Sequence, residues 1–361
     1  MRIDMHCHVV GEDTKDINEA DTKVFFKPED NFAFLPWLLY QIVKPELINM
    51  NVDINKDGKI SSDEYLSLIY NILISSKEID GIVLLALDAV YCHKIGILKE
   101  KETDLFVTNK LLSRKVKELN KRLKTDLNPN AKRKKFFFGA SVNPNRKNWK
   151  EELEYVLFET DAVLVKLIPS VQHINLMDDK HTDFYKMLSA KKMPLLCHVG
   201  REHSFAEGVR KKNWHLDNYE NLEKPLECGV TVIAAHCSAP VFPGIEKNVI
   251  KEFRSFMGKH NSSGKIKLYA DTSALSLSTR MPIIPDIVKT FPPEWLVNGS
   301  DLPIPIKGWT HLPLIKNNIT FDEYNEFLKT TNVLDKDVKI KRAYGFSDSI
   351  LDNAEKVLRL V

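Results

Sequence analysis

The sequence of 361 residues predicts a closed (β/α)8 barrel, the TIM-barrel class, and three observations support this fold. Eight short apolar runs follow one another along the chain, as expected of parallel strands buried on both faces. Segments with helical spacing of apolar residues separate most of these runs, which indicates a parallel sheet. Ionisable residues stand at the ends of five runs. An open doubly wound sheet is the alternative, but it more often has a glycine-rich phosphate loop after an early strand, and the sequence contains none.

The expected strands and helices alternate along the chain. The predicted strands are Met1–Val9, Gly81–Asp88, Lys135–Val142, Ala162–Ile168, Met193–Val199, Val230–His236, Ile266–Asp271 and Trp295–Asp301. The predicted helices between and after them are Leu111–Leu123, Trp149–Phe158, Phe184–Ala190, Leu222–Cys228, Ile245–Met257, Asp286–Thr290, Phe321–Thr330 and Ser349–Leu360.

The segment between the first two strands, from Val10 to Asp80, is far longer than an ordinary βα loop. A barrel needs about 250 residues, so the surplus length is expected to decorate the barrel. We therefore predict one domain of residues 1–361 with a helical cap, residues 10–80, inserted after the first strand.

Composition and charge exclude several classes of protein. Apolar residues make up 43% and charged residues 28% of the chain, which is ordinary for a globular protein. The net charge of +3 gives no electrostatic reason to expect nucleic acid or a membrane surface as a partner. The five cysteines form no Cys-x-x-Cys pair and the N-terminus has no apolar signal region, so we expect a protein of the reducing cytoplasm without disulfides.

Six ionisable residues lie at the ends of five predicted strands. His6 and His8 are two residues apart in the first strand, so both imidazoles point to one side and can share a metal ion. The fourth, fifth, sixth and eighth strands end with Lys166, His198, His236 and Asp301, in that order. Barrels place their active sites at this end of their strands. The sequence therefore predicts a metal site there.

Several segments resemble one family of metal-dependent barrels, the amidohydrolase superfamily. The matching segments are Asp4-x-His6-x-His8, Val165–Pro169, Leu196–Gly200, Ala235–Cys237, Ala270–Ser273, Gly299–Pro303 and the C-terminal Asp352-Asn353-Ala354. The chain looks most like the amidohydrolase-related branch, which contains hydrolases and non-oxidative decarboxylases. The resemblance covers nearly the whole barrel and is weakest in the predicted cap.

The resemblance implies that His6, His8, His198 and Asp301 bind a divalent metal. Three imidazoles and one carboxylate suit Zn²⁺, with Mn²⁺ or Fe²⁺ as alternatives. It also implies that Asp301 acts as general base towards a metal-activated water. His236 is implied to be a proton shuttle or to polarise the substrate carbonyl.

Lys166 has two interpretations under this resemblance. A carboxylated Lys166 would bridge two metal ions, and His198 and His236 would both bind the second. An unmodified Lys166 would bind a substrate carboxylate or pair with Asp301. We favour the second interpretation and one catalytic metal ion.

A second motif lies inside the predicted cap, where residues 53–64 match an EF-hand calcium loop position by position. The predicted calcium ligands are Asp53, Asn55, Asp57, Lys59 through its carbonyl, Ser61 and Glu64. Helical segments Leu35–Met50 and Glu64–Ile74 flank the loop. The alternative is an Asp-Gly turn before a helix that Ser61 or Ser62 caps. Bound Ca²⁺ is expected to fix the cap in place.

Three functions remain open. The leading one is hydrolysis, in which water attacks a carbonyl or related carbon. A decarboxylase could use the same residues, and a non-catalytic metal-binding barrel is the third alternative. We expect a small-molecule substrate, which can be anionic. A homodimer is compatible with the sequence. Arg201 and His203 are the candidate substrate-binding residues, with Arg280 as a weaker one because an Arg fork can hold an anionic group.

Overall fold

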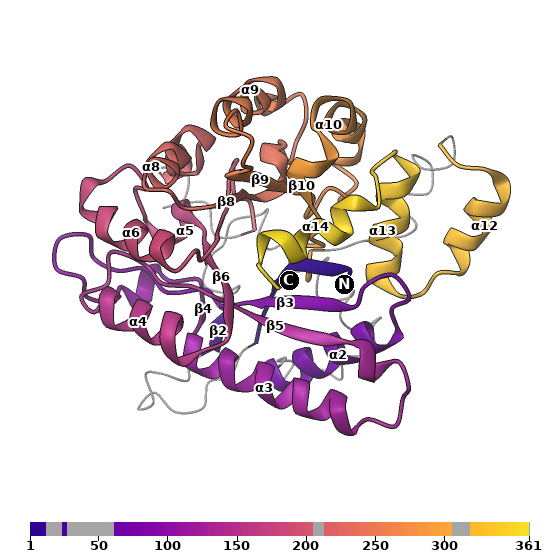
Figure 1. The fold of residues 1–361 in the computed structure, drawn as a ribbon, viewed down its shortest axis with the longest axis horizontal. Helices are drawn as coiled ribbons and strands as arrows, with labels where there is room; N and C mark the ends of the chain where they lie inside the picture. Colours follow the sequence, from indigo (N-terminus) through magenta and orange to yellow (C-terminus); the bar gives the residue numbers. More distant parts are fainter. Residues whose placement is uncertain (12–23, 27–60, 205–212, 305–317, 361) are drawn as a thin grey trace.

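The computed structural model describes residues 1–11, 24–26, 61–204, 213–304 and 318–360 (Figure 1). Its main sheet has eight parallel strands in the order β1-β3-β5-β6-β7-β8-β9-β10. Their bounds are β1 Ile3–His8, β3 Gly81–Leu85, β5 Lys135–Ala140, β6 Ala162–Leu167, β7 Leu195–Cys197, β8 Val232–Ala234, β9 Leu268–Asp271 and β10 Leu296–Val297. Each of the eight predicted strands contains one of these, so the strand prediction is confirmed.

Backbone hydrogen bonds between the two ends of the sheet close the barrel. Met5 N donates to Asn298 O at 3.0 Å, and His8 N donates to Leu302 O at 2.8 Å. In the opposite direction, Asp301 N donates to His6 O at 2.8 Å. The prediction of a (β/α)8 barrel is therefore confirmed.

The barrel interior is apolar below its C-terminal end. Leu164 and Leu196 belong to a buried cluster inside the sheet. Because side chains two residues apart in a strand share a face, Lys166 and His198 follow these leucines on the inner side of the barrel. Helix α14 (Ser349–Val357) packs Ala354 and Val357, together with Leu358 beyond its end, into the same cluster, and so covers the opposite end of the barrel. The apolar layer leaves the ionisable residues at one end.

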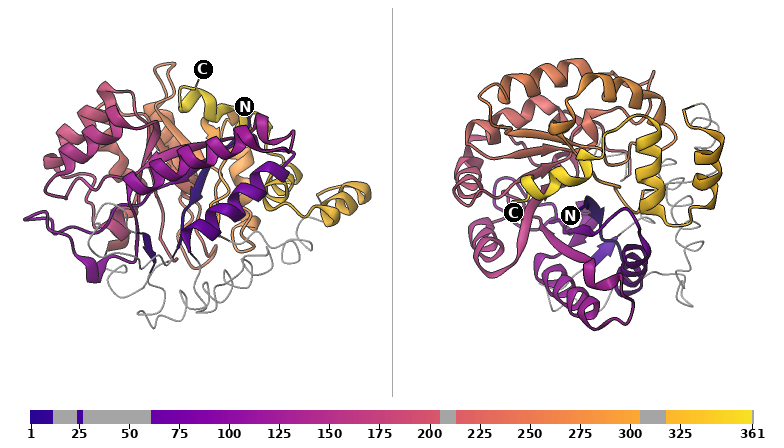
Figure 2. Two further views of the ribbon diagram at one scale, coloured as in Figure 1. Left: turned by 90° about the horizontal axis from the view of Figure 1, so that it is seen from below. Right: turned by 45° about the vertical axis from the view of Figure 1, so that its right-hand side comes forward.

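Helices surround the sheet in Figure 1. The helices after strands are α3 Asn109–Thr125, α4 Trp149–Glu159, α5 Pro169–Gln172, α6 Thr182–Ala190, α8 Glu223–Glu227, α9 Ile250–His260 and α10 Ile284–Thr290. Helix α12 (Phe321–Lys329) stands out from the side of the barrel (Figure 2), and α13 (Val333–Ala343) lies between it and the sheet. The sequence did not predict α13. None of the described helices has the length and apolar character that a membrane crossing requires.

Within the predicted cap, the described secondary-structure elements are β2 (Val24–Phe26) and α2 (Ser62–Ser75). β2 pairs antiparallel with β4 (Leu105–Val107), a small sheet that the sequence did not predict. Helix α2 coincides with the predicted helix Glu64–Ile74, and its Tyr65 hydroxyl donates to His8 O at 2.9 Å. This hydrogen bond ties the end of the insertion to the end of β1.

The predicted calcium ligands Asp53, Asn55, Asp57 and Lys59 lie outside the described residues. Ser61 and Glu64 lie inside them and form a capping box at the start of α2. Glu64 N donates to Ser61 Oγ at 3.2 Å, and Ser61 N donates to Glu64 Oε2 at 2.8 Å. This part of the motif therefore has the geometry of the capping alternative, and calcium binding stays a prediction.

Candidate metal centre

His6, His8 and Asp301 converge at the C-terminal end of the barrel. His6 Nε2 lies 3.1 Å from His8 Nε2 and 3.2 Å from Asp301 Oδ1, and His8 Nε2 lies 3.4 Å from the same oxygen. Ligands about 2.1 Å from a tetrahedral Zn²⁺ lie about 3.4 Å from one another. The three donor atoms therefore have the spacing of ligands around one ion. Among the described residues they form a group of three potential ligands within 4.8 Å of one another.

The loop after β10 is held by buried polar contacts that place Asp301. Asp301 has a φ of +69°, and a Cβ on Gly299 would come within 2.7 Å of the His6 Cβ, so glycine is required there. Ser300 donates from its N and its Oγ to Asp4, at 2.9 and 2.5 Å. Burial raises the pKa of Asp4 to about 6. Lys341 Nζ donates to Gly299 O at 2.7 Å, so α13 supports the loop from below.

Asp271 and Ser273, at the end of β9, orient two imidazoles. His6 Nδ1 donates to Asp271 Oδ2 at 2.7 Å, and the Ser273 hydroxyl donates to Asp271 Oδ1. Because a carboxylate only accepts, the proton of His6 sits on Nδ1 and its Nε2 lone pair faces His8 and Asp301. Burial favours the neutral carboxyl, but His6 and Ser273 outweigh it and hold the pKa of Asp271 below its ordinary value. His6 is thus prepared to bind a metal through Nε2.

His198 and His236 form a second pair beside this group. His198 Nδ1 lies 3.2 Å from His236 Nε2, and the rings of His236 and His6 stack with centroids 5.4 Å apart. His198 Nε2 donates a hydrogen bond to Gly200 O at 3.1 Å, and the hydroxyl of Ser273 lies 2.8 Å from His236 Nδ1. With these tautomers two lone pairs face each other, an arrangement that favours a cation between them.

Both imidazoles of this pair are neutral at pH 7. Burial lowers the pKa of His198 to about 4 and lowers that of His236 well below its ordinary value. Neutral imidazole is the form that binds metals. The structure places His198 against His236, next to the three-residue group, and its predicted role as fourth ligand stays a prediction. So do the predicted roles of His236 and Asp301 in proton transfer.

Lys166 contacts the three-residue group through His6. Its side chain is fully buried, and Nζ is 3.1 Å from His6 Nε2. Burial lowers the pKa of this amine, which favours its neutral form. A neutral amine is the form that reacts with CO2, and it can equally accept a hydrogen bond. Among the described residues, Lys166 contacts His6 and forms no ion pair with Asp301, so the role of this lysine stays a prediction.

The two predicted substrate-binding residues after β7 contact other parts of the protein. Arg201 is exposed, and its guanidinium lies 4.8 Å from the centre of the Trp214 ring. His203 is bonded to Glu246 through a 3.0 Å contact between Nε2 and Oε1. Arg280, the weaker candidate, is 97% buried, with only 3% of its surface exposed. Substrate binding by all three stays a prediction.

The sequence analysis assigned no role to Asp271 and Ser273. Asp271 follows the apolar run of the seventh predicted strand, so the rule that identified His198 and His236 applies to it as well. Their contacts with His6 and His236 could not be foreseen, because they depend on how the neighbouring strands align.

No protein-family model and no curated protein matches the chain. Similar solved structures exist. An uncharacterized TIM-barrel protein from Bordetella bronchiseptica is 15% identical, with 98% of this chain and 99% of that chain covered and a TM-score of 0.49. A structure named amidohydrolase II is 17% identical, with 99% and 100% covered and a TM-score of 0.45. The 5-carboxyvanillate decarboxylase of Sphingomonas paucimobilis is 11% identical, with 99% and 98% covered and a TM-score of 0.47.

Proposed function

We propose that this chain is a metal-dependent hydrolase of the amidohydrolase type. The observation that supports it most is the convergence of His6, His8 and Asp301 on one point at the C-terminal end of the barrel. A divalent ion held there would supply water that ionises near neutral pH. Two nitrogen donors and one oxygen donor suit Zn²⁺, with Mn²⁺ or Fe²⁺ as alternatives, and we propose one such ion per chain.

Asp301 is the proposed general base. Burial raises the pKa of its carboxyl, but His6 and His8 outweigh this effect, so the pKa lies below its ordinary value and the group is ionised at pH 7. Its Oδ1 faces the two imidazoles. The described contacts leave Oδ2 to accept a proton from the attacking water.

His236 is the proposed second proton-transfer group. Ser273 fixes its Nδ1, through the hydroxyl at 2.8 Å and the carbonyl at 3.1 Å, so its Nε2 is directed into the site. Because its pKa is lowered by burial, a proton that it receives is readily passed on to a leaving group. Asp271 accepts a hydrogen bond from His236 N at 2.8 Å and thereby links the position of this residue to that of His6.

Product analysis with the zinc-loaded protein tests this proposal. We expect lactone, ester or amide substrates to incorporate one oxygen atom from ¹⁸O-labelled water, and Asp301→Asn to reduce turnover by about 10²-fold or more. His93→Gln is the matched control, because His93 is exposed and bonded to Asp178 on the surface. Release of CO2 without ¹⁸O incorporation would favour the decarboxylase. A binding protein without activity would be indicated if no substrate of either class turned over.

We also propose that residues 53–64 bind Ca²⁺ and that the protein occupies a reducing compartment. The first proposal is supported by the match of the loop sequence and is tested by calorimetric titration of Ca²⁺ into the protein and into Asp53→Ala. The second is supported by five cysteines that are all free thiols. Fluorescence microscopy of the tagged full chain in its own cell tests it.

A further inference from the structure

Arg280 is a buried cation with no ion-pair partner among the residues that the structure describes. It is 3% exposed, and its Nε has no hydrogen-bond partner. No carboxylate of the described residues lies within ion-pair distance of its guanidinium. A buried charge that is neither paired nor fully hydrogen-bonded is costly to the fold. A protein tolerates such a group where a bound ligand supplies the missing opposite charge and hydrogen bonds.

The carboxylates nearest to Arg280 lie against histidines and not against its guanidinium. Those that act on its charge are Asp301, Glu202, Glu246 and Asp271. Each faces a histidine instead: Asp301 faces His6 and His8, Asp271 faces His6, Glu202 faces His198, and Glu246 faces His203. Among the described residues, none of these four carboxylates therefore forms a direct ion pair with Arg280.

Arg280 lies in the loop that begins at the candidate metal centre. Asp271 and Ser273 open this loop, and Ala274 N donates to Ser300 O at 3.3 Å, so the loop runs beside the one that holds Asp301. Arg280 therefore follows Asp271 and Ser273 in a loop that borders the residues of the proposed chemistry.

We propose that Arg280 binds a carboxylate group of the substrate. This inference deepens the proposed function and depends on it for the identity of the site. One unpaired positive charge matches one carboxylate, and the guanidinium fork can hold both of its oxygens. A phosphate group has a charge of about −1.5 to −2 and would leave negative charge in excess. Arg201, which is exposed beside Trp214, has no comparable need of an anion.

Calorimetric titrations with benzoate and benzamide test the inference, because the two probes have similar shapes and differ in charge. We expect benzoate to bind the wild-type protein and Arg280→Gln to weaken it by about 10- to 100-fold, the usual effect of losing hydrogen bonds to a charged group. Benzamide binding should change by less than about twofold. Phenyl phosphate should bind more weakly than benzoate. The inference is wrong if wild type does not bind benzoate, if Arg280→Gln binds it normally, or if phenyl phosphate binds more tightly.

The same titrations are run with zinc-loaded protein and after chelation. If the metal proposal fails, no zinc is retained, yet the loss of benzoate binding in Arg280→Gln is still measurable. If only the Arg280 inference fails, zinc is retained and benzoate binding does not depend on this residue. The two failures are therefore distinguishable.

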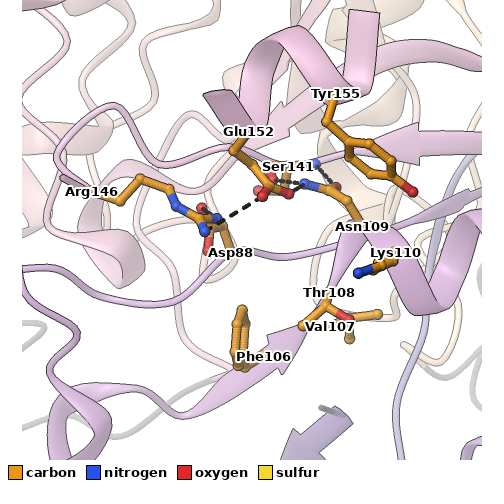
Figure 3. Close-up of a pocket in the computed structure, with 10 residues that line it drawn as sticks. All are labelled: Asp88, Phe106, Val107, Thr108, Asn109, Lys110, Ser141, Arg146, Glu152 and Tyr155. Atoms are coloured by element: carbon orange, nitrogen blue, oxygen red, sulfur yellow. Dashed lines mark hydrogen bonds and ion pairs between the residues drawn. The ribbon is translucent and has the colours of Figure 1, made fainter. Parts of the chain in front are cut away.

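Thermal unfolding separates a ligand-binding arginine from a structural one. Arg280→Met removes an unpaired buried charge, so its Tm should rise by about 2–4 °C. Arg146→Met is the matched control, because Arg146 contacts Asp88 Oδ2 at 3.2 Å and Glu152 Oε2 at 3.4 Å in the pocket of Figure 3. Its Tm should fall, and its benzoate affinity should not change. A lower Tm or loss of folding in Arg280→Met would show a structural role and overturn the inference.

Discussion

Replacement of Asp271 by Asn is predicted to weaken metal binding without any change in the ligands themselves. Asp271 accepts hydrogen bonds from His6 Nδ1, from His236 N at 2.8 Å, and from both the N and the Oγ of Ser273. The amide side chain of Asn keeps only one of the two oxygens of the Asp271 carboxylate. Three donors converge on Oδ1 and one on Oδ2, so the oxygen of Asn is expected to stay at the Oδ1 position and its NH2 group to face His6.

The size of the effect follows from this geometry. Two donors, the NH2 group and His6 Nδ1–H, cannot share a 2.7 Å contact, so His6 must move its proton to Nε2 or turn away. A proton on Nε2 would occupy the position that faces the metal. Loss of such an orienting carboxylate typically costs 10- to 100-fold in metal affinity, or about 1.4–2.7 kcal/mol.

Competition with a chromophoric zinc chelator measures this affinity. Asp217→Asn is the matched control, because Asp217 is a buried carboxyl whose pKa is raised well above its ordinary value by burial. An amide oxygen can still accept from Ser170 N at 2.8 Å, so Asp217→Asn should change zinc affinity by less than about twofold. Wild-type zinc affinity in Asp271→Asn, or an equal loss in Asp217→Asn, would refute the reasoning.

Three further predictions concern charge and pH. Burial lowers the pKa of His198 to about 4, so between about pH 4 and 6.5 the unfolded chain binds more protons than the folded chain. The stability of the metal-free protein is therefore full above pH 6.5, and it falls by up to about 3 kcal/mol as the pH is lowered to 4. Denaturant unfolding across this range should show that slope reduced in His198→Gln, and an unchanged slope in the variant would disprove the assignment. Lys341→Met leaves Asp337 buried without the ammonium group that lies 2.5 Å from it, and should lower the free energy of unfolding in urea by about 3–5 kcal/mol. The double variant with Asp337→Leu should recover much of this stability. Equal losses of stability in the single and double variants would speak against a paired charge. Lys166→Gln should retain one zinc ion per chain by elemental analysis, and a fall from two ions to one would instead indicate a carboxylated bridging lysine.

The strands of the barrel were predictable because they are buried on both faces. In β6, for example, Leu164 packs inside the barrel and Val165 packs towards the helices, so the sequence is apolar at consecutive positions. Where the inner face reaches the end of the barrel, a single charge, Lys166, interrupts the run. The same change from apolar to ionisable revealed most of the candidate site.

Other elements could not be predicted from local patterns. Helix α13 buries Asp337 and Lys341 on the face that would otherwise be apolar, so its helical periodicity is hidden by a buried ion pair. In the β2–β4 sheet, where Val24 pairs with Val107, two three-residue strands come together from distant parts of the sequence. Such pairing depends on the arrangement of the insertion and not on either strand alone.

The sequence also could not rank the arginines near the barrel end. Arg201 and Arg280 both follow predicted strands and both could bind an anion. Only the folded chain shows that Arg201 is exposed and that Arg280 is buried with no ion-pair partner in the described part of the chain. Burial decides which of two chemically identical groups needs a ligand.

Elemental analysis of the purified chain after reconstitution with zinc tests the central claim most directly. We expect one zinc ion per wild-type chain, its loss in His6→Asn and in Asp301→Asn, and its retention in His93→Gln. These outcomes follow from the donor atoms of His6, His8 and Asp301, which lie 3.1–3.4 Å apart. A wild-type chain without bound zinc, or full zinc retention in His6→Asn, would contradict the proposed metal centre.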